Sequence, residues 1–324
     1  KPIRLLMSFR ALLFKWPVLS AAAAGTLLAS AGAPAAADPI DPVTANVPKY
    51  VIPLVIPPQM PANNKTTEPC PAGAKCPNMS YNIAERQFKQ QILPGGIWNA
   101  LNGRSDPFNP TTVWSYGSAA DPIPMGLTLN GVQVQPPGVA PVPATQSSFN
   151  YPAFTVENRS QQTNTVRWIN ELVAIDPTTG KPYPLGDSRR TSLSHLLPID
   201  RTLLFANPEK LPCAEPGGTG NALPGRPDCH PYVDPNNPNQ LLSQSYDGPV
   251  PMVVHVHGAE VNPYSDGFTE AWWLASAFNP KNGNPLSTDF ATRGTHYDQA
   301  PTFRNNQYPG SAGYLYENAQ PPTT

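Results

Sequence analysis

The chain has 324 residues and a formal net charge of −1, so it offers no electrostatic basis for binding nucleic acid. That length suffices for one or two domains. Charged residues make up only 13% of the chain and prolines number 44, which argues against long exposed helices and predicts many loops.

The N-terminal segment 1–37 has the pattern of a secretory signal peptide. Basic residues precede an apolar run from Trp16 to Ala33, and small residues follow that run. We expect translation to start at Met7 and cleavage to follow Ala37. A membrane anchor is the alternative, but Ala, Gly and Ser make the run only weakly hydrophobic. The mature protein is therefore expected to be periplasmic or extracellular, with no membrane contact after cleavage.

The next segments lead into the main domain, which we expect over 81–324. Residues 38–80 are rich in proline and are interpreted as an extended arm against that domain or as a linker. Residues 81–93 fit a helical face tolerably and have helical propensity, but a strand is also open. Residues 112–117 combine β-branched and aromatic side chains with a terminal glycine, which predicts a strand.

Two further runs predict a β-hairpin. Residues 151–157 alternate in side-chain character, a polar turn covers 158–164, and 165–170 is again rich in strand-forming residues. The later segment 213–248 contains Pro, Gly and Asn with almost no apolar run. That composition is typical of a surface insertion.

The cysteines are Cys70, Cys76, Cys213 and Cys229, and all lie in proline- and glycine-rich loops. In an oxidising compartment such residues form disulfides. Of the three possible pairings we prefer Cys70 with Cys76 and Cys213 with Cys229, because each bridge would staple a loop that lacks packing. No Cys-x-x-Cys spacing is present, which disfavours a metal site built from them.

The segment 253–257 carries the strongest chemical signal. Valines interleave with His255 and His257, a proline precedes the run, and Gly258 follows it, so the segment is predicted to be a strand. Side chains alternate along a strand, so both imidazoles project from one face with Cα atoms about 6.7 Å apart. Burying two imidazoles costs free energy unless each has a partner, and a metal ion is the commonest partner for such a pair.

The spacing alone leaves the identity of the metal open. Zinc enzymes and cupins also place His-x-His on strands, although the following Glu of a cupin lies a little further on than Glu260 does here. The other histidines, His195, His230 and His296, lie in loops without a partner at ligand spacing. We interpret them as structural or surface residues.

The wider stretch resembles the first copper-binding motif of the multicopper oxidases, in particular the bacterial laccase and bilirubin oxidase branch. The matching residues are Val-Val-His-Val-His-Gly at 253–258, Ser-Asp-Gly-Phe at 265–268 and Glu-Ala-Trp at 270–272. Supporting matches lie at 149–157, 166–173 and 195–200. On this resemblance, 81–93 is expected to be the opening strand of the family's first domain.

The resemblance implies an all-β, cupredoxin-like Greek-key barrel or sandwich, the first domain of a multidomain oxidase and incomplete at its C-terminal end. It implies that His255 binds the type 2 copper and His257 one of the paired type 3 coppers of a trinuclear centre. Asp266 falls where the family has a carboxylate that helps to deliver protons to bound oxygen. Asp266 is also a typical turn residue in Ser-Asp-Gly, and Trp272 and Trp273 are expected to be core or rim aromatics.

The family's remaining ligands are not found in this sequence. A trinuclear centre needs several more imidazoles than five histidines provide, and a blue copper needs a Cys in a His-Cys-His setting. We therefore expect the chain to be an N-terminal fragment that is inactive alone. The blue copper and a second His-x-His strand are expected beyond Thr324.

The reaction implied for the whole protein is one-electron oxidation of a donor coupled to reduction of dioxygen to water. A phenolic or bilirubin-like donor is the family default, and Mn(II) is an alternative suggested, by analogy alone, by the long loops at 96–150 and 206–250. Two other classes stay open. One is a mononuclear cupin-type metalloenzyme, and the other is a non-catalytic secreted β-sandwich module with a structural His pair.

Overall fold

The structure is a computed structural model of the chain, which divides into two compact units, Lys1–Val47 and Pro48–Thr324. Predictions for the signal segment, the cysteine side chains, His230 and His296 lie outside the described residues. The structure describes residues 47–52, 57–64, 79–124, 147–158, 160–197, 248–268, 271–289, 292–294 and 308–319, and the backbone of four short strands at 128–129, 132–133, 213–214 and 222–223.

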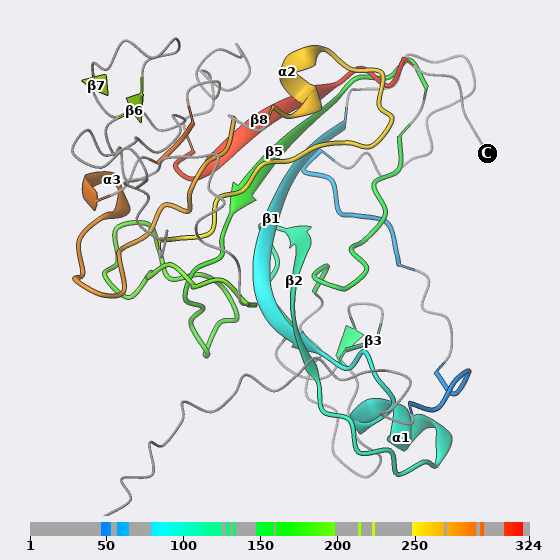
Figure 1. Ribbon diagram of the computed structural model, residues 1–324. Coiled ribbons are helices and arrows are strands. Elements are labelled where there is room, and N and C mark those ends of the chain that lie inside the picture. Colours follow the sequence, from blue (N-terminus) through cyan, green and yellow to red (C-terminus); the bar gives the residue numbers. More distant parts are fainter. Residues whose placement is uncertain are drawn as a thin grey trace, which may run out of the picture. The chain divides into compact units, whose positions relative to one another are not determined.

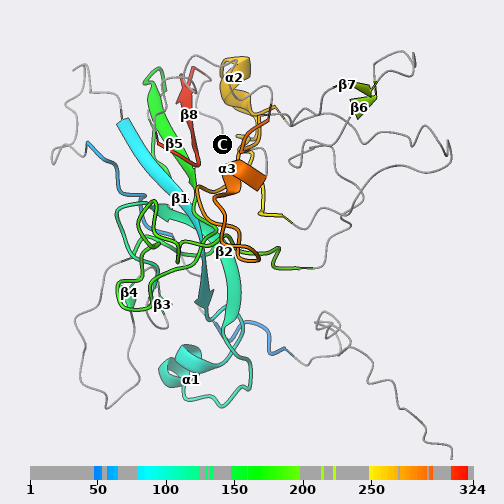
Figure 2. The same ribbon diagram turned by 90° about the vertical axis from the view of Figure 1, so that its left-hand side faces the viewer.

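A four-stranded mixed sheet organises the second unit, in the order β2-β1-β5-β8 (Figure 1). Its strands are β1 (Met79–Gln90), β2 (Thr111–Ser118), β5 (Asn164–Asn170) and β8 (Ser311–Tyr316). The central strand β1 pairs antiparallel with β2 and parallel with β5, and β5 pairs antiparallel with β8. Figure 2 shows the same strands side by side from a second direction.

The other regular elements of the described residues are short. Strand β3 (Thr128–Leu129) pairs with β4 (Val132–Gln133), and β6 (Cys213–Ala214) pairs with β7 (Ala222–Leu223). The helices are α1 (Gly96–Asn102), α2 (Pro263–Asp266) and α3 (Leu286–Asp289). Strands therefore dominate, with few helices and an open mixed sheet, as the sequence predicts for an all-β protein. No helix among the described residues is long and apolar enough to cross a membrane.

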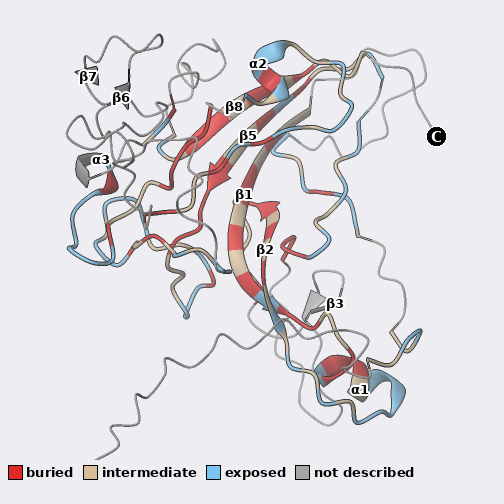
Figure 3. Ribbon diagram, viewed as in Figure 1, coloured by how far each residue is buried: buried red, intermediate tan, exposed pale blue. Residues whose placement is uncertain are grey.

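Both faces of the sheet are packed, because side chains alternate along each strand. Along β1, Tyr81 and Ile83 enter one hydrophobic cluster, and Ala84 and Phe88 enter another. Figure 3 shows the resulting run of buried positions along the sheet. Each fully buried large side chain stabilises the fold by roughly 1.5–3 kcal/mol, so the two clusters supply much of the stability of this unit.

The second cluster depends on one glycine in β2. A Cβ atom at Gly117 would lie 2.5 Å from the ring of Phe149, which is fully buried. The ring also meets Phe88 edge-on, with 6.1 Å between the ring centroids. Only a residue without a side chain lets Phe149 lie this close to the sheet.

Two strand predictions are confirmed. Residues 81–93 form most of β1 rather than a helix, and 112–117 lie within β2. The helical propensity of the first segment is overridden because its alternate side chains enter clusters on opposite faces of the sheet.

The predicted hairpin of 151–157 with 165–170 is wrong. The second run is β5, but both of its edges are already occupied by β1 and β8. In the first run, the side chain of Gln90 binds the backbone of Tyr151 in both directions, with Gln90 Oε1 accepting and Gln90 Nε2 donating, each at 2.7 Å. The first run is therefore held by this side chain and, at Thr155, by a parallel bridge to Gln59, and not by β5.

Part of the proline-rich segment lies as an arm against the domain. In residues 57–64, the amide of Met60 donates to the carbonyl of Thr155 at 2.8 Å, and the amide of Thr155 donates to Pro58 at 2.9 Å. The side chain of Met60 is buried in the first cluster. These residues therefore belong to the core of the domain rather than to a free linker.

Candidate metal site at His255 and His257

Alternate side chains of the His-x-His segment are buried and exposed, although the segment is not one of the strands β1 to β8. Its one ladder contact is an antiparallel bridge between Met252 and Trp273, whose amides and carbonyls bond reciprocally at 2.9 Å. Met252 and Val254 are buried in the first cluster, whereas Val253 is 45% exposed. The predicted strand is therefore wrong as a paired element. The alternation behind it is present, because the first cluster takes every second side chain.

Both imidazoles lie on the outer face of this segment. The side chain of His255 is 49% exposed, and His257 is also exposed. Their ring centroids are 5.2 Å apart with an interplanar angle of 58°. The rings are therefore exposed, not buried as the apolar strand pattern led us to expect. The structure instead presents two neighbouring imidazoles that an ion can approach from outside.

The turn that carries Asp266 approaches the histidine segment very closely. Helix α2 begins after Asn262, whose side chain accepts from the amide of Ser265, and it ends at Asp266, just before the capping residue Gly267. Gly267 has a φ of +89°, and a Cβ atom there would lie 2.0 Å from the carbonyl oxygen of Val254. A glycine at this position is what allows the turn and the histidine segment to touch.

This contact fixes the tautomer of His255. Its Nδ1 atom lies 2.5 Å from the backbone carbonyl oxygen of Asp266 and 3.3 Å from Oδ1 of the same residue. A carbonyl oxygen can only accept, so Nδ1 carries a proton, and in the neutral imidazole Nε2 then keeps its lone pair. Histidines that bind metals typically donate their other ring N–H to such an acceptor, which orients the ring and raises its basicity.

The donor set therefore fits a metal ion but does not complete its coordination. Two imidazoles can hold a copper or zinc ion, and protein sites for such ions normally supply three or four ligands. Within the described ranges, no group of three His, Cys, Asp or Glu side chains is close enough to hold one ion. Among the described residues, the pair could therefore supply only part of a coordination sphere.

Exposed apolar side chains lie on the histidine segment and on the turn that contacts it. Besides Val253, Tyr264 is 42% exposed and Phe268 is 38% exposed, and both belong to the turn that contacts His255. Large apolar side chains beside a polar site are typical of a surface that another part of a protein covers.

The remaining predicted residues have other surroundings. Trp272 and Trp273 are 3% and 1% exposed, which confirms that they are core aromatics. His195 is half-buried, and this burial lowers the pKa of its imidazole.

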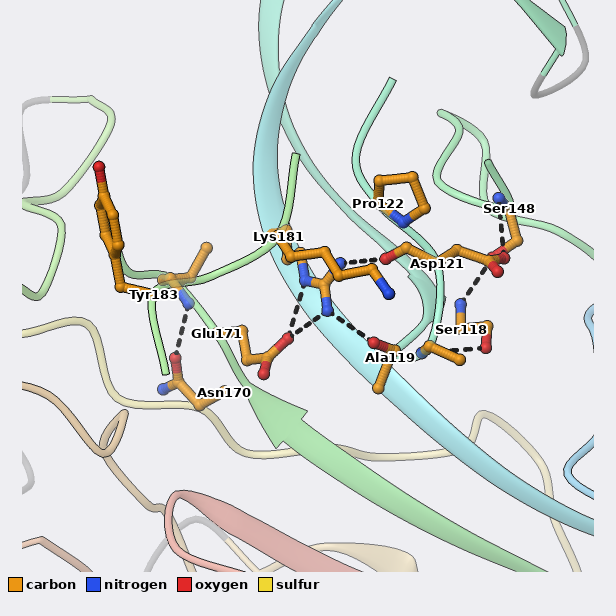
Figure 4. Close-up of polar contacts among 12 residues, drawn as sticks. Ser118, Ala119, Asp121, Pro122, Ser148, Asn170, Glu171, Lys181 and Tyr183 are labelled. Carbon is orange, nitrogen blue, oxygen red and sulfur yellow. Dashed lines mark hydrogen bonds and ion pairs between the residues drawn. The ribbon is translucent and has the colours of Figure 1, made fainter. Parts of the chain in front are cut away.

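A buried charged cluster was not found by the sequence reasoning. The guanidinium of Arg86, on β1, contacts the Glu171 carboxylate at 2.7 Å and donates to the backbone carbonyls of Ala119 and Asp121. Figure 4 shows these acceptors converging from separate segments. A second guanidinium, that of Arg190, lies 3.6 Å from the other Glu171 oxygen. The available signal was Arg86 itself, a charged residue between Ala84 and Phe88 on an apolar strand face.

The cluster is a cross-link of the fold. All of its charged side chains are almost fully buried, and Arg190 also donates to the backbone carbonyls of Tyr183 and Ser276. Buried charges are tolerated only when they are paired and hydrogen-bonded in this way. Each nitrogen of the Arg86 guanidinium has an acceptor within the protein and the cluster is buried, so we assign it no binding role.

Comparison with known proteins gives no independent assignment. No protein-family model matches the chain, and no curated protein matches it significantly.

Proposed function

We propose that this chain is part of a secreted multicopper oxidase and supplies the first two ligands of its trinuclear copper centre. The observation that best supports the proposal is the state of His255. Its Nδ1–H donates to the Asp266 carbonyl. Its Nε2 can then offer a lone pair to a metal ion, beside the second exposed imidazole. In this proposal, the all-β unit is a cupredoxin-like domain and the strands of its sheet belong to a Greek key.

In this proposal, His255, His257 and Asp266 have different roles. His255 would hold the type 2 copper and His257 a type 3 copper, each through a neutral imidazole nitrogen. When bound, the copper centre supplies the four-electron reduction of dioxygen to water, using electrons from a donor oxidised elsewhere in the protein. The carboxylate of Asp266 is 53% exposed and would pass protons toward that centre. Its backbone carbonyl would keep the His255 ring in orientation.

The partial donor set agrees with ligands contributed by other parts of the protein. The sequence contains only five histidines, so most imidazoles of a trinuclear centre would come from outside these residues. The apolar side chains of Val253, Tyr264 and Phe268 would then be covered by the domain that carries those ligands. A phenolic or bilirubin-like donor is proposed, with Mn(II) as the alternative. Its site would lie near the blue copper and outside this chain.

The proposal is tested on the complete protein by metal analysis and oxygen consumption. We expect several coppers per chain. The double substitution His255→Ala, His257→Ala should remove the trinuclear coppers and abolish oxygen consumption while the blue copper absorbance remains. The same double change at His195 and His230, which lack ligand spacing in the sequence, is the control and should leave both readouts intact.

Three results would contradict the proposal. One iron, manganese or zinc ion per chain would favour a mononuclear cupin-type enzyme. Unchanged copper content and oxygen consumption in the double variant would favour a non-catalytic β-sandwich module with a structural His pair. Turnover of a phenol by the isolated 324-residue chain would contradict the partial nature of the site.

A further inference from the structure

Helix α2 is too short to be stable by itself. It contains four residues, and isolated helices of that length do not form in water. Its position must therefore be set by contacts with the rest of the domain. Those contacts decide where the carbonyl and the carboxylate of Asp266 lie, and hence how His255 is held.

Ser265 makes the first of these contacts. It is completely buried, and its Oγ atom accepts from the backbone amide of Leu315 at 3.0 Å. Leu315 belongs to β8, which is at the end of the strand order, and α2 lies against this strand (Figure 1). The hydroxyl thus satisfies an amide on the outer edge of the sheet and anchors the turn there.

Glu317 makes the second contact from just beyond β8. Its carboxylate accepts from the backbone amide of Asn262 at 3.2 Å and from the Asn262 side chain at 3.3 Å. Asn262 in turn accepts from the amide of Ser265 with its side-chain oxygen at 3.1 Å. The start of α2 is therefore fixed to the end of β8 at two points, one at each end of its first turn.

We propose that Ser265 and Glu317 are positioning residues for His255. They hold α2 on β8, so that the Asp266 carbonyl keeps the imidazole proton on Nδ1 and leaves Nε2 free to bind a metal. Ser265 contacts Leu315 and Glu317 contacts Asn262, so each side chain acts on the imidazole through the turn. The role of Nε2 as a metal ligand rests on the proposed function, whereas the control of the tautomer does not.

The test is the tautomer of His255 in the metal-free 324-residue chain. Long-range proton–nitrogen NMR spectra, recorded above the usual imidazole pKa, distinguish Nδ1–H from Nε2–H. In the parent chain we expect Nδ1–H to predominate at His255. We expect Ser265→Ala and Glu317→Ala each to lower the ratio of Nδ1–H to Nε2–H at least several-fold. Glu317→Gln keeps one acceptor for Asn262 and should restore part of the ratio.

Ser115→Ala is the matched control. Ser115 is also a buried serine whose hydroxyl makes one hydrogen bond to the backbone, at 2.6 Å to Asn150, but it lies on β2 at the opposite end of the strand order. This variant should weaken the fold without changing the His255 tautomer. Glu317 is half-buried at the end of β8, so Glu317→Ala serves as the readout if Ser265→Ala does not fold.

The outcomes separate this inference from the proposed function. A tautomer ratio that is unchanged in Glu317→Ala, or changed equally in Ser115→Ala, overturns the positioning role and leaves the copper proposal as it was. A ratio that falls as expected supports the positioning role. It does so even when the complete protein proves to carry no copper at His255, a result that would defeat the proposed function alone.

Discussion

Two contacts between ionisable side chains show how differently this domain treats its core and its candidate site. The Arg86–Glu171 contact is 2.7 Å long, and its side chains are 1% and 5% exposed. The His255–Asp266 contact is 3.3 Å long, and its side chains are 49% and 53% exposed. The first is closed on every side by protein, and the second faces outward.

The difference separates a group that stabilises from a group that can bind. Each nitrogen of the Arg86 guanidinium has an acceptor within the protein, so this side chain has nothing left to offer a ligand. His255 uses one ring nitrogen to hold its orientation and keeps the other. Changes in the first region should therefore alter stability and, if the proposed function holds, changes in the second should alter metal binding.

Removing Glu171 should have the largest effect on stability. Glu171→Ala leaves the buried guanidinium groups of Arg86 and Arg190 without their carboxylate, and we expect a loss of about 3–5 kcal/mol in the free energy of unfolding. Urea denaturation measures it. Arg189→Ala, which breaks the exposed Arg189–Asp187 pair, is the control and should leave the midpoint unchanged. Equal shifts in the two variants would refute the distinction.

Glu85 should make the stability of the domain depend on pH. Burial raises the pKa of its carboxyl from 4.5 to about 7. As pH rises, the carboxyl loses its proton in the unfolded state before it does so in the folded state. The free energy of unfolding therefore falls between pH 4.5 and pH 7 and stays lower above pH 7. The full difference corresponds to about 3 kcal/mol.

Glu85→Gln removes this penalty. The variant should be more stable than the parent chain at pH 8, by up to about 3 kcal/mol, and should differ little from it at pH 4. Thermal unfolding at the two pH values measures the difference. If the stability difference between variant and parent is the same at pH 8 as at pH 4, Glu85 ionises at its ordinary pKa.

Gly267 and Gly258 form a matched pair for the site region. Both have a positive φ, of +89° and +68°, so an alanine is strained at either position. Only at Gly267 would the new Cβ also meet backbone, 2.0 Å from the Val254 oxygen, whereas nothing lies within 4 Å at Gly258. We expect Gly267→Ala to be about 1–3 kcal/mol more destabilising than Gly258→Ala in chemical denaturation. Equal losses would mean that the close approach is not required.

The smallest effect is expected at Trp168. Its Nε1–H donates to the buried Tyr316 hydroxyl at 3.0 Å. Trp168→Phe removes this donor and should cost about 1 kcal/mol in urea denaturation. In Trp114→Phe, the lost partner is the half-buried Gln87 side chain, which water can solvate, so the loss should be smaller. The reverse order would contradict the role given to burial.

Local patterns predicted the elements whose partners lie close in the chain. The alternation of side chains around His255 and His257 predicted that both lie on one face of their segment. The β-branched and aromatic residues of 112–117 predicted strand β2. The partner of β5 could not be predicted, because it depends on β1 and β8, which are distant in sequence. The sequence also did not predict that position 267 requires glycine, because the requirement arises from contact with the backbone of Val254 in a different segment.

The buried charge cluster is a second feature whose pairing could not be predicted from local sequence patterns. Arg86 stands in a strand pattern as an apparent exception, and nothing near it in sequence identifies Glu171 as its partner. Pairing across 85 residues is set by the register of β1 beside β5, which places the end of β5 next to Arg86. Sequence periodicity assigns faces, but only the assembled sheet brings these charges together.

The most direct test of the account is anomalous diffraction at the copper absorption edge from crystals of the complete, copper-loaded protein. We predict separate copper peaks about 2 Å from an imidazole nitrogen of His255 and of His257, with the one at His255 on Nε2. Full copper occupancy elsewhere in the protein, with no peak at either ring, would contradict the account.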